Sequence, residues 1–335
     1  MGIHVIQPGL LTTIQDGGRF GFQKFGVVVG GAMDSFAYRI ANLLVGNRET
    51  EAALEITLMG PTLAFQEDVV IAICGGDLSP SINHQPIPNW RPIYVKKGSI
   101  LRFGPCVSGC RAYLAVAGGI DVTPVLGSYS TYLRGQFGGF HGRALKRDDV
   151  LPLKSQPICN RVKRFSIKKD QPFVLADFFV SPDILPRYQK DPVIRFLPGK
   201  EYDLFTPEAH EIFERSFFQV TPQSDRMGYR LEGPVLSLKQ SVEMISEAVT
   251  FGTVQVPADG KPIVLMADRQ TTGGYPKLAQ VITVDLPVLA QVKPGEKITF
   301  SQVTISEAER LYLEQESNIR LLQARIQLYW SQGGI

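Results

Sequence analysis

The highest density of reactive side chains lies in residues 268–276. This stretch holds two charged groups, an amide, two hydroxyls, a glycine pair and a phenol: Asp268, Arg269, Gln270, Thr271, Thr272, Gly273, Gly274, Tyr275 and Pro276. A loop that only joins two buried strands needs few such groups, whereas a loop that holds a small polar ligand needs several. The segment is therefore predicted to bind a ligand, with a hydrogen-bonded barrel corner as the alternative.

A second polar cluster surrounds Asp225. Arg226 and Arg230 flank this carboxylate within residues 224–230. Because a guanidinium can grip a carboxylate or phosphate with two hydrogen bonds, the cluster is a candidate anion site, and an interdomain salt bridge is the alternative. The glycine-rich stretches 15–19 and 127–139 carry carboxylate, guanidinium and hydroxyl groups, and they are weaker candidates for the same chemistry.

Several well-known site patterns are missing from the sequence. It contains no phosphate-binding P-loop, no dinucleotide-binding glycine motif, no nucleophile elbow and no segment of the type that carries covalent biotin. The four cysteines (Cys74, Cys106, Cys110 and Cys159) and the four histidines do not form a pattern with metal-ligand spacing. No metal site is therefore expected.

Composition indicates a soluble globular protein. The 335 residues suffice for one large or two ordinary domains, and 44% are hydrophobic against 20% charged. A net charge of +3 without a long basic run gives no indication of nucleic-acid binding. No basic leader or long apolar run appears, so we expect a cytoplasmic protein without a membrane segment.

The sequence predicts that the elements which position these groups are mainly β-strands. Short apolar runs between turn signals predict strands in a sandwich or barrel, at 69–73, 99–103, 112–116, 193–196, 263–266, 281–284 and 297–300. The 32 glycines and 23 prolines agree with many turns. A weak echo between segments 54–63 and 231–236 suggests two related barrels.

Three helices stand out against this background. Asp34 is a predicted cap for a helix ending near Gly46, and Thr206 followed by Pro207 predicts a second start. A capping box at Ser306 predicts a long C-terminal helix to about Gly333. Its apolar seam fits either a partner-binding helix or a helix packed on its own domain: Ala308, Tyr312, Gln315, Ile319, Leu322, Ile326 and Tyr329.

Ordered motifs along nearly the whole chain resemble one known family. They lie at 8–19, 31–34, 41–47, 54–55, 117–120, 126–128, 224–228, 255–257 and 268–276. Together they resemble the allophanate-hydrolase-subunit-2 family, also called the biotin-dependent carboxyltransferase family. One departure is the segment 197–200, where the family usually has a Gly-Pro-Gln type sequence, so no function is carried over to it.

The resemblance implies a fold of two cyclophilin-like β-barrel domains in tandem, with a few peripheral helices and a long C-terminal helix. We expect the first barrel at 1–155, a linker at 156–190, the second barrel at 191–305 and the helix at 306–335. For a stand-alone chain of this length, the resemblance also implies one component of ATP-dependent 5-oxoprolinase, which converts 5-oxo-L-proline, ATP and water to L-glutamate, ADP and phosphate.

The implied activity requires partners and assigns roles to the polar clusters. The partners are the A subunit of the enzyme and its B subunit, which is similar to a sporulation-kinase inhibitor, and the ATP site need not lie in this chain. Asp268, Gln270 and Asp225 are the catalytic candidates. The substrate-binding candidates are Arg226, Gln255, Arg269, Thr271, Thr272 and Tyr275. Two alternatives remain open: a carboxyltransferase half acting on urea or a related amide, and a purely regulatory antagonist of the kinase inhibitor.

Overall fold

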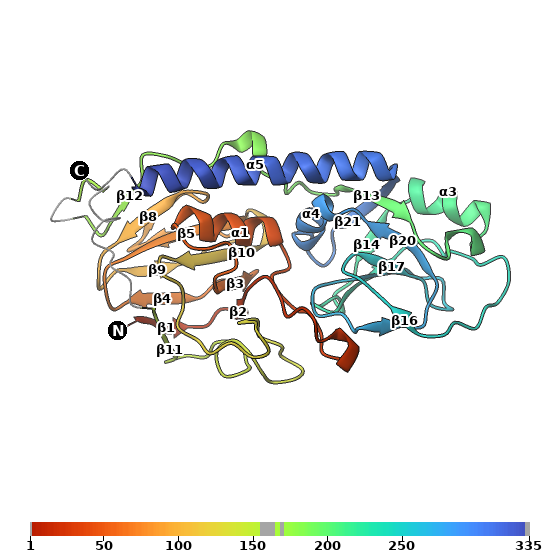
Figure 1. The fold of residues 1–335 in the computed structure, drawn as a ribbon, viewed down its shortest axis with the longest axis horizontal. Coiled ribbons are helices and arrows are strands. Elements are labelled where there is room, and N and C mark those ends of the chain that lie inside the picture. Colours follow the sequence, from red (N-terminus) through yellow and green to blue (C-terminus); the bar gives the residue numbers. More distant parts are fainter. Residues whose placement is uncertain (1, 155–164, 168–170, 332–335) are drawn as a thin grey trace. The chain divides into compact units, whose positions relative to one another are not determined.

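The computed structural model describes residues 2–154, 165–167 and 171–331 (Figure 1). Parts of the predicted linker, Cys159 and the predicted helix end near Gly333 lie outside these ranges. No helix of the described chain has the length and apolar character needed to cross a bilayer. The chain divides into two compact units: unit 1 is Met1–Gly18, Asp34–Leu185 and Glu316–Ile335, and unit 2 is Arg19–Met33 and Pro186–Gln315.

Unit 1 contains two six-stranded antiparallel sheets. The first sheet has the order β11 (Val150–Pro152), β1 (Gly2–Gln7), β4 (Thr62–Phe65), β9 (Ile100–Arg102), β6 (Ser81–Ile82) and β7 (Gln85–Pro86). The second has the order β12 (Phe173–Leu175), β8 (Pro92–Val95), β5 (Val69–Asp77), β10 (Ser108–Val116), β3 (Ala53–Thr57) and β2 (Leu11–Gln15). One buried apolar core, rich in isoleucine, leucine and valine, holds the sheets together.

Helix α1 (Ser35–Leu44) lies on the second sheet of unit 1. Its predicted cap is confirmed: the Asp34 carboxylate accepts a hydrogen bond from the Ala37 N–H at 2.8 Å. Eight of its ten residues are buried, so the helix is covered on more than the side that faces the sheet.

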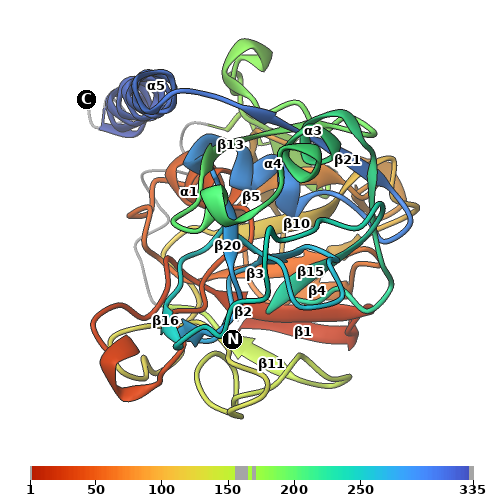
Figure 2. The ribbon, with the colours of Figure 1, turned by 90° about the vertical axis from the view of Figure 1, so that its right-hand side faces the viewer.

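Unit 2 is a closed barrel, which Figure 2 shows together with the helices α3 and α4. Its strands follow the order β13 (Val193–Pro198), β20 (Lys277–Val281), β17 (Thr253–Gln255), β18 (Ile263–Leu265), β15 (Gly228–Glu232), β14 (Phe218–Val220) and β21 (Lys297–Gln302). The outer ribbon of β16 (Glu247–Ala248) and β19 (Thr272–Gly273) is separate from the barrel. Closure of the barrel leaves its strands without free edges.

The predicted helix start at Thr206 is also confirmed. Helix α3 (Pro207–Arg215) has proline in its first turn, and the Thr206 hydroxyl accepts a hydrogen bond from the Ala209 N–H at 3.1 Å. Phe213 stacks on Phe300 of β21 at 4.2 Å between ring centroids, which fixes α3 to the barrel core.

The predicted strand at 281–284 was wrong in part. Strand β20 ends at Val281, and Thr283–Asp285 form a 3-10 helix that continues into α4 (Leu286–Ala290). The chain turns away because the Asp285 carboxylate accepts hydrogen bonds from the backbone and guanidinium of Arg195, at 2.5–3.0 Å, and Pro287 lies in the first turn of α4.

The long C-terminal helix α5 (Ile305–Ser331) is present, but its predicted cap was wrong. The helix begins before Ser306, and the Thr304 hydroxyl accepts the hydrogen bond from the Glu307 N–H at 3.2 Å. Thr304 and Glu307 have the three-residue spacing that a capping box requires, and so does the predicted pair of Ser306 and Glu309. Two seam residues, Ile319 and Ile326, are the buried positions of the helix.

The second half of α5 packs within unit 1. Arg39 of α1 donates two hydrogen bonds to the Glu316 carboxylate, at 2.5 and 2.9 Å. The Trp330 indole N–H donates to the Leu44 carbonyl at 3.2 Å. This half of the seam therefore serves intramolecular packing, whereas several leucines elsewhere on α5 remain exposed.

Candidate functional site

The loop 268–276 links two barrel strands of unit 2. It follows β18, contains the short strand β19, and leads directly into β20. Strand β19 pairs with β16 through the registers Glu247 with Gly273 and Ala248 with Thr272. The backbone of the loop is thus held at both ends by the barrel and in the middle by a second strand.

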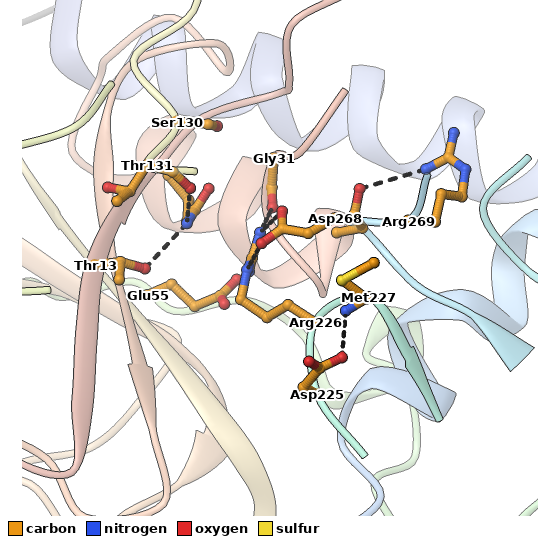
Figure 3. A network of polar contacts seen from close by, with 12 residues as sticks. Thr13, Gly31, Glu55, Ser130, Thr131, Asp225, Arg226, Met227, Asp268 and Arg269 are labelled. Atoms are coloured by element: carbon orange, nitrogen blue, oxygen red, sulfur yellow. Dashed lines mark hydrogen bonds and ion pairs between the residues drawn. The ribbon is translucent and has the colours of Figure 1, made fainter. Parts of the chain in front are cut away.

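Arg226 and Asp268 form a buried ion pair at the start of this loop (Figure 3). The Arg226 Nε and one terminal nitrogen donate to the two Asp268 oxygens, both at 2.9 Å, and the side chains are 7% and 6% exposed. The same terminal nitrogen donates to the Gly31 carbonyl at 2.6 Å. Such a bidentate pair is satisfied internally, so its main effect is to fix the two chain segments to each other.

Arg269 lies beside this pair, but the surroundings of its charge differ from those of the Arg226 charge. Its guanidinium makes one long contact of 3.5 Å to the Ala267 carbonyl and lies 6.0 Å from the centroid of the Phe251 ring. Its Nε is buried and has no hydrogen-bond partner among the described residues. Burial lowers the pKa of Arg269 to about 10, and Asp268 offsets this shift only in part. At neutral pH the side chain is therefore a charged, incompletely satisfied cation, which an anion would stabilise.

Asp225 shapes the turn before β15. Its carboxylate accepts hydrogen bonds from the backbone N–H groups of Met227 and Gly228, at 2.8 and 3.3 Å. Asp225 is exposed, whereas the adjacent Arg226 is buried. The carboxylate thus stabilises the turn from which Arg226 points into the unit.

Gln255 of β17 lies beneath the loop. Its side chain is buried, and its amide nitrogen donates to the Tyr275 carbonyl at 3.4 Å. A Cβ atom at Gly273 would lie 2.3 Å from that nitrogen, so glycine is what allows the loop to approach the amide. Gln255 therefore supports the loop from the barrel side.

The remaining predicted residues lie along the outer side of the loop. Gln270, Thr272 and Tyr275 are exposed, and Thr271 is half-buried. The Thr271 carbonyl accepts a hydrogen bond from the Val249 N–H at 3.2 Å, which continues the pairing of β19 with β16. The nine predicted site residues all belong to unit 2: six lie in this loop, two lie in the turn joined to it by the Arg226–Asp268 pair, and Gln255 lies beneath it.

A charged cluster at the end of the loop was not predicted. The ammonium group of Lys277 is buried and lies 3.3 Å from Glu247 and 3.6 Å from Glu201. Lys200 also contacts Glu247, at 2.6 Å, and holds the pKa of that carboxyl below its usual value together with Lys277. The sequence signal was weak, because only the position of Lys277 directly after Pro276 connects the cluster with the loop.

Residues 15–18 of the weaker candidate segment 15–19 meet the segment 127–139 within unit 1, whereas Arg19 belongs to unit 2. Asp16 accepts hydrogen bonds from the hydroxyls of Ser128 and Ser130, at 2.7 and 2.5 Å, and from the Tyr129 N–H at 2.6 Å. The Gly18 N–H adds a fourth, at 2.8 Å. The Gln15 amide nitrogen donates to the Thr131 carbonyl at 3.3 Å. Four donors satisfy the Asp16 carboxylate, so this cluster fixes loops rather than binding an anion.

Comparison with known proteins confirms the family resemblance. A family model described as "Carboxyltransferase domain, subdomain A and B" matches residues 25–302. The C subunit of 5-oxoprolinase from Haemophilus influenzae is 41% identical over 314 residues, which cover 94% of this chain and 95% of the relative. The C subunit of the enzyme of that name from Escherichia coli is 40% identical over 325 residues, which cover 97% and 98%.

Longer proteins contain a similar region. The urea amidolyase of Saccharomyces cerevisiae is 34% identical over 330 residues, which cover 96% of this chain and 18% of the relative. The crystal structure of the Kluyveromyces lactis urea carboxylase matches with a TM-score of 0.87 and 34% identity, over 96% of this chain and 29% of that chain. This likeness and the strand topology confirm the predicted mainly β fold with peripheral helices and a long C-terminal helix.

Proposed function

The chain belongs to the family of carboxyltransferase domains with subdomains A and B, and on that premise we propose that it is the C subunit of an ATP-dependent 5-oxoprolinase. Two relatives with that name, about 40% identical over nearly their full lengths, support this assignment. The complex would convert 5-oxo-L-proline, ATP and water to L-glutamate, ADP and phosphate.

Arg269 carries the proposal, because the substrate has a carboxylate. A half-buried guanidinium with a pKa lowered to about 10 and an Nε without a partner among the described residues is a receptor for such a group. The substrate carboxylate would pair with the positive charge of Arg269, and this contact would orient the lactam ring. The Arg226 guanidinium, by contrast, already holds the Asp268 carboxylate.

The other side chains of the loop have roles that follow from their positions. Gln270 presents an exposed amide next to Arg269 and would hydrogen-bond the lactam, while Thr271, Thr272 and Tyr275 would line the site. Asp268 and Asp225 are the candidates for orienting a proton transfer, and Gln255 would act by holding the loop.

The proposed activity depends on further proteins and on ATP. We assign the A and B subunits of the same enzyme as partners in the cytoplasm, with the nucleotide bound by the complex and not necessarily by this chain. The chain would also bind and counteract a sporulation-kinase inhibitor similar to the B subunit, through the surface that contacts the B subunit.

Reconstitution tests the proposed function. The purified A and B subunits are mixed with 5-oxo-L-proline and ATP, with and without this chain, and glutamate release is measured. Release that requires this chain is the expected result. A stable complex with the B subunit that releases no glutamate would contradict the enzymatic proposal and would leave the regulatory one.

A carboxyltransferase acting on urea is the second candidate, because urea amidolyase and urea carboxylase share the fold at 34% identity. Urea has no carboxylate, so its turnover would need no cation at Arg269. A carboxylation assay with urea and a biotinylated carrier protein separates the two candidates, since 5-oxoprolinase requires no such carrier.

A further inference from the structure

A cavity of about 350 Å³ lies within unit 1, between the second half of α5 and the segment 178–184. That segment includes the 3-10 helix η2 (Pro182–Ile184). In Figure 1 it is the green stretch near α5. None of the predicted site residues lines this cavity, so the proposed function makes no use of it: its walls are Phe178, Phe179, Ser181, Ile184, Asn318, Leu321, Leu322, Arg325, Ile326 and Tyr329.

The apolar walls of the cavity are held in place by packing. The rings of Phe178 and Tyr329 lie 4.4 Å apart between centroids, and Trp330 lies 5.0 Å from Tyr329. Ile326 at the base is 3% exposed. Because the wall residues pack against one another, filling the cavity would cost little reorganisation of the protein.

The polar groups of the cavity come mainly from one face of α5. Asn318, Leu322, Arg325 and Tyr329 follow one another at intervals of four, three and four residues, so they lie in one row. Arg325 is the charged member of the described lining, and none of the lining residues is acidic. The nearby Asp183 accepts a hydrogen bond from the Ser181 hydroxyl at 3.1 Å and does not line the cavity. The lining therefore combines an apolar body with a single positive charge.

We propose that this cavity binds a small amphipathic carboxylate, with its apolar body among Phe178, Leu322 and Ile326 and its carboxylate on Arg325. The volume of 350 Å³ falls in the lower part of the range of small-molecule sites. The size of the cavity and its single positive charge thus favour a small anion.

Calorimetric titration of the isolated chain with octanoate tests the site, and Trp330 fluorescence gives a second readout. We expect saturable binding at one site per chain, a change in Trp330 emission, and binding weakened by about fivefold or more in Arg325→Gln. The matched control is Arg310→Gln, which removes an exposed arginine from the same helix and should leave octanoate binding unchanged.

Two further measurements keep the test decisive. Leu322→Phe should fill part of the cavity and abolish octanoate binding while the thermal unfolding midpoint stays near that of the unaltered chain. Octan-1-ol should bind equally to the unaltered chain and to Arg325→Gln. Absence of saturable octanoate binding, or equal weakening by Arg325→Gln and Arg310→Gln, would overturn the proposal. The assay contains no partner protein and no ATP, so its result is independent of the proposed enzyme activity.

Discussion

The Arg226 guanidinium holds the Asp268 carboxylate through two hydrogen bonds of 2.9 Å, across 42 residues of sequence. The pair continues the ladder of β15 and β18 beyond the strand ends, because the Asp268 N–H also donates to the Arg226 carbonyl at 2.7 Å. Arg269 follows Asp268 directly in the sequence. The Arg226–Asp268 pair therefore fixes the place of the Arg269 cation, whose hydrogen bonds are incomplete.

Removing one charge of this pair should destabilise unit 2. In Asp268→Asn the buried Arg226 cation loses the charge of its Asp268 partner, and the expected loss in the free energy of unfolding is about 3–5 kcal/mol. Urea denaturation followed by circular dichroism measures it. Glu232→Gln breaks the exposed pair with Lys261 and is the control, with almost no expected change. An Asp268→Asn loss below about 1 kcal/mol would contradict the structural role of the pair.

Arg269 substitutions should act on substrate binding. Arg269→Gln is expected to raise KM for 5-oxo-L-proline by about tenfold to a hundredfold, since a hydrogen-bonded charge on the carboxylate is lost. Arg269→Lys should restore part of the affinity. Steady-state kinetics of the reconstituted complex measure both.

Two controls limit the interpretation of the Arg269 variants. Arg230→Ala removes an exposed arginine of β15 and should leave KM unchanged. The carboxamide of 5-oxo-L-proline, which has no charge, should inhibit the unaltered chain and Arg269→Gln equally. Stronger inhibition of the unaltered chain would mean that Arg269 does not recognise the carboxylate.

The contact between Gly273 and Gln255 predicts a rescue. In Gly273→Ala the new methyl group would lie 2.3 Å from the Gln255 amide nitrogen, so we expect a loss of about 1–3 kcal/mol in the free energy of unfolding and lower activity. The double variant Gly273→Ala with Gln255→Ala should recover much of the stability. Additive losses in the double variant, measured by chemical denaturation, would show that the two residues are not coupled.

The pair between Arg39 and Glu316 should make stability depend on pH in the acid range. Hydrogen bonds from Arg39 hold the pKa of the Glu316 carboxyl below its usual value. The unfolded chain therefore binds more protons than the folded chain near pH 4, and stability rises with pH there. The contribution of the pair is full above the unfolded pKa and is lost as the pH falls through the folded pKa.

The corresponding experiment compares thermal unfolding midpoints of the unaltered chain and Glu316→Gln between pH 3 and 7. The difference should be largest near pH 7 and shrink toward pH 3. Glu314→Gln, which removes an exposed pair with Arg310 on the same helix, should give a smaller and flatter difference. A Glu316→Gln difference that does not change with pH would assign the effect to packing.

Exposed leucines of α5 offer a test of the proposed partner contact. Leu313 and Leu328 are 66% and 59% exposed. If α5 binds the B subunit, Leu313→Glu or Leu328→Glu should reduce complex formation in size-exclusion chromatography, since burying a carboxylate is costly. Gln327→Glu adds the same charge beside Leu328 and is the control. Undiminished binding in both leucine variants would move the contact to the barrel surfaces.

The sequence alone was enough to predict features that depend on residues close to one another along the chain. The caps at Asp34 and Thr206 were predicted because a capping side chain finds its N–H partner three residues away. The composition of loop 268–276 marked it as a candidate site for a similar reason, since its polar groups are adjacent. The predicted cap at Ser306 was wrong because Thr304 satisfies the same local spacing.

The tertiary structure decided which charges are satisfied. Arg226 and Arg269 were equivalent substrate-binding candidates in the sequence, yet the register of β15 with β18 pairs Arg226 with Asp268 and leaves the Arg269 Nε without a partner among the described residues. Gln255 likewise came to lie under Gly273 through the packing of β17 beneath the loop. Burial and long-range register set the electrostatics of each group, and neither is a property of a residue and its sequence neighbours.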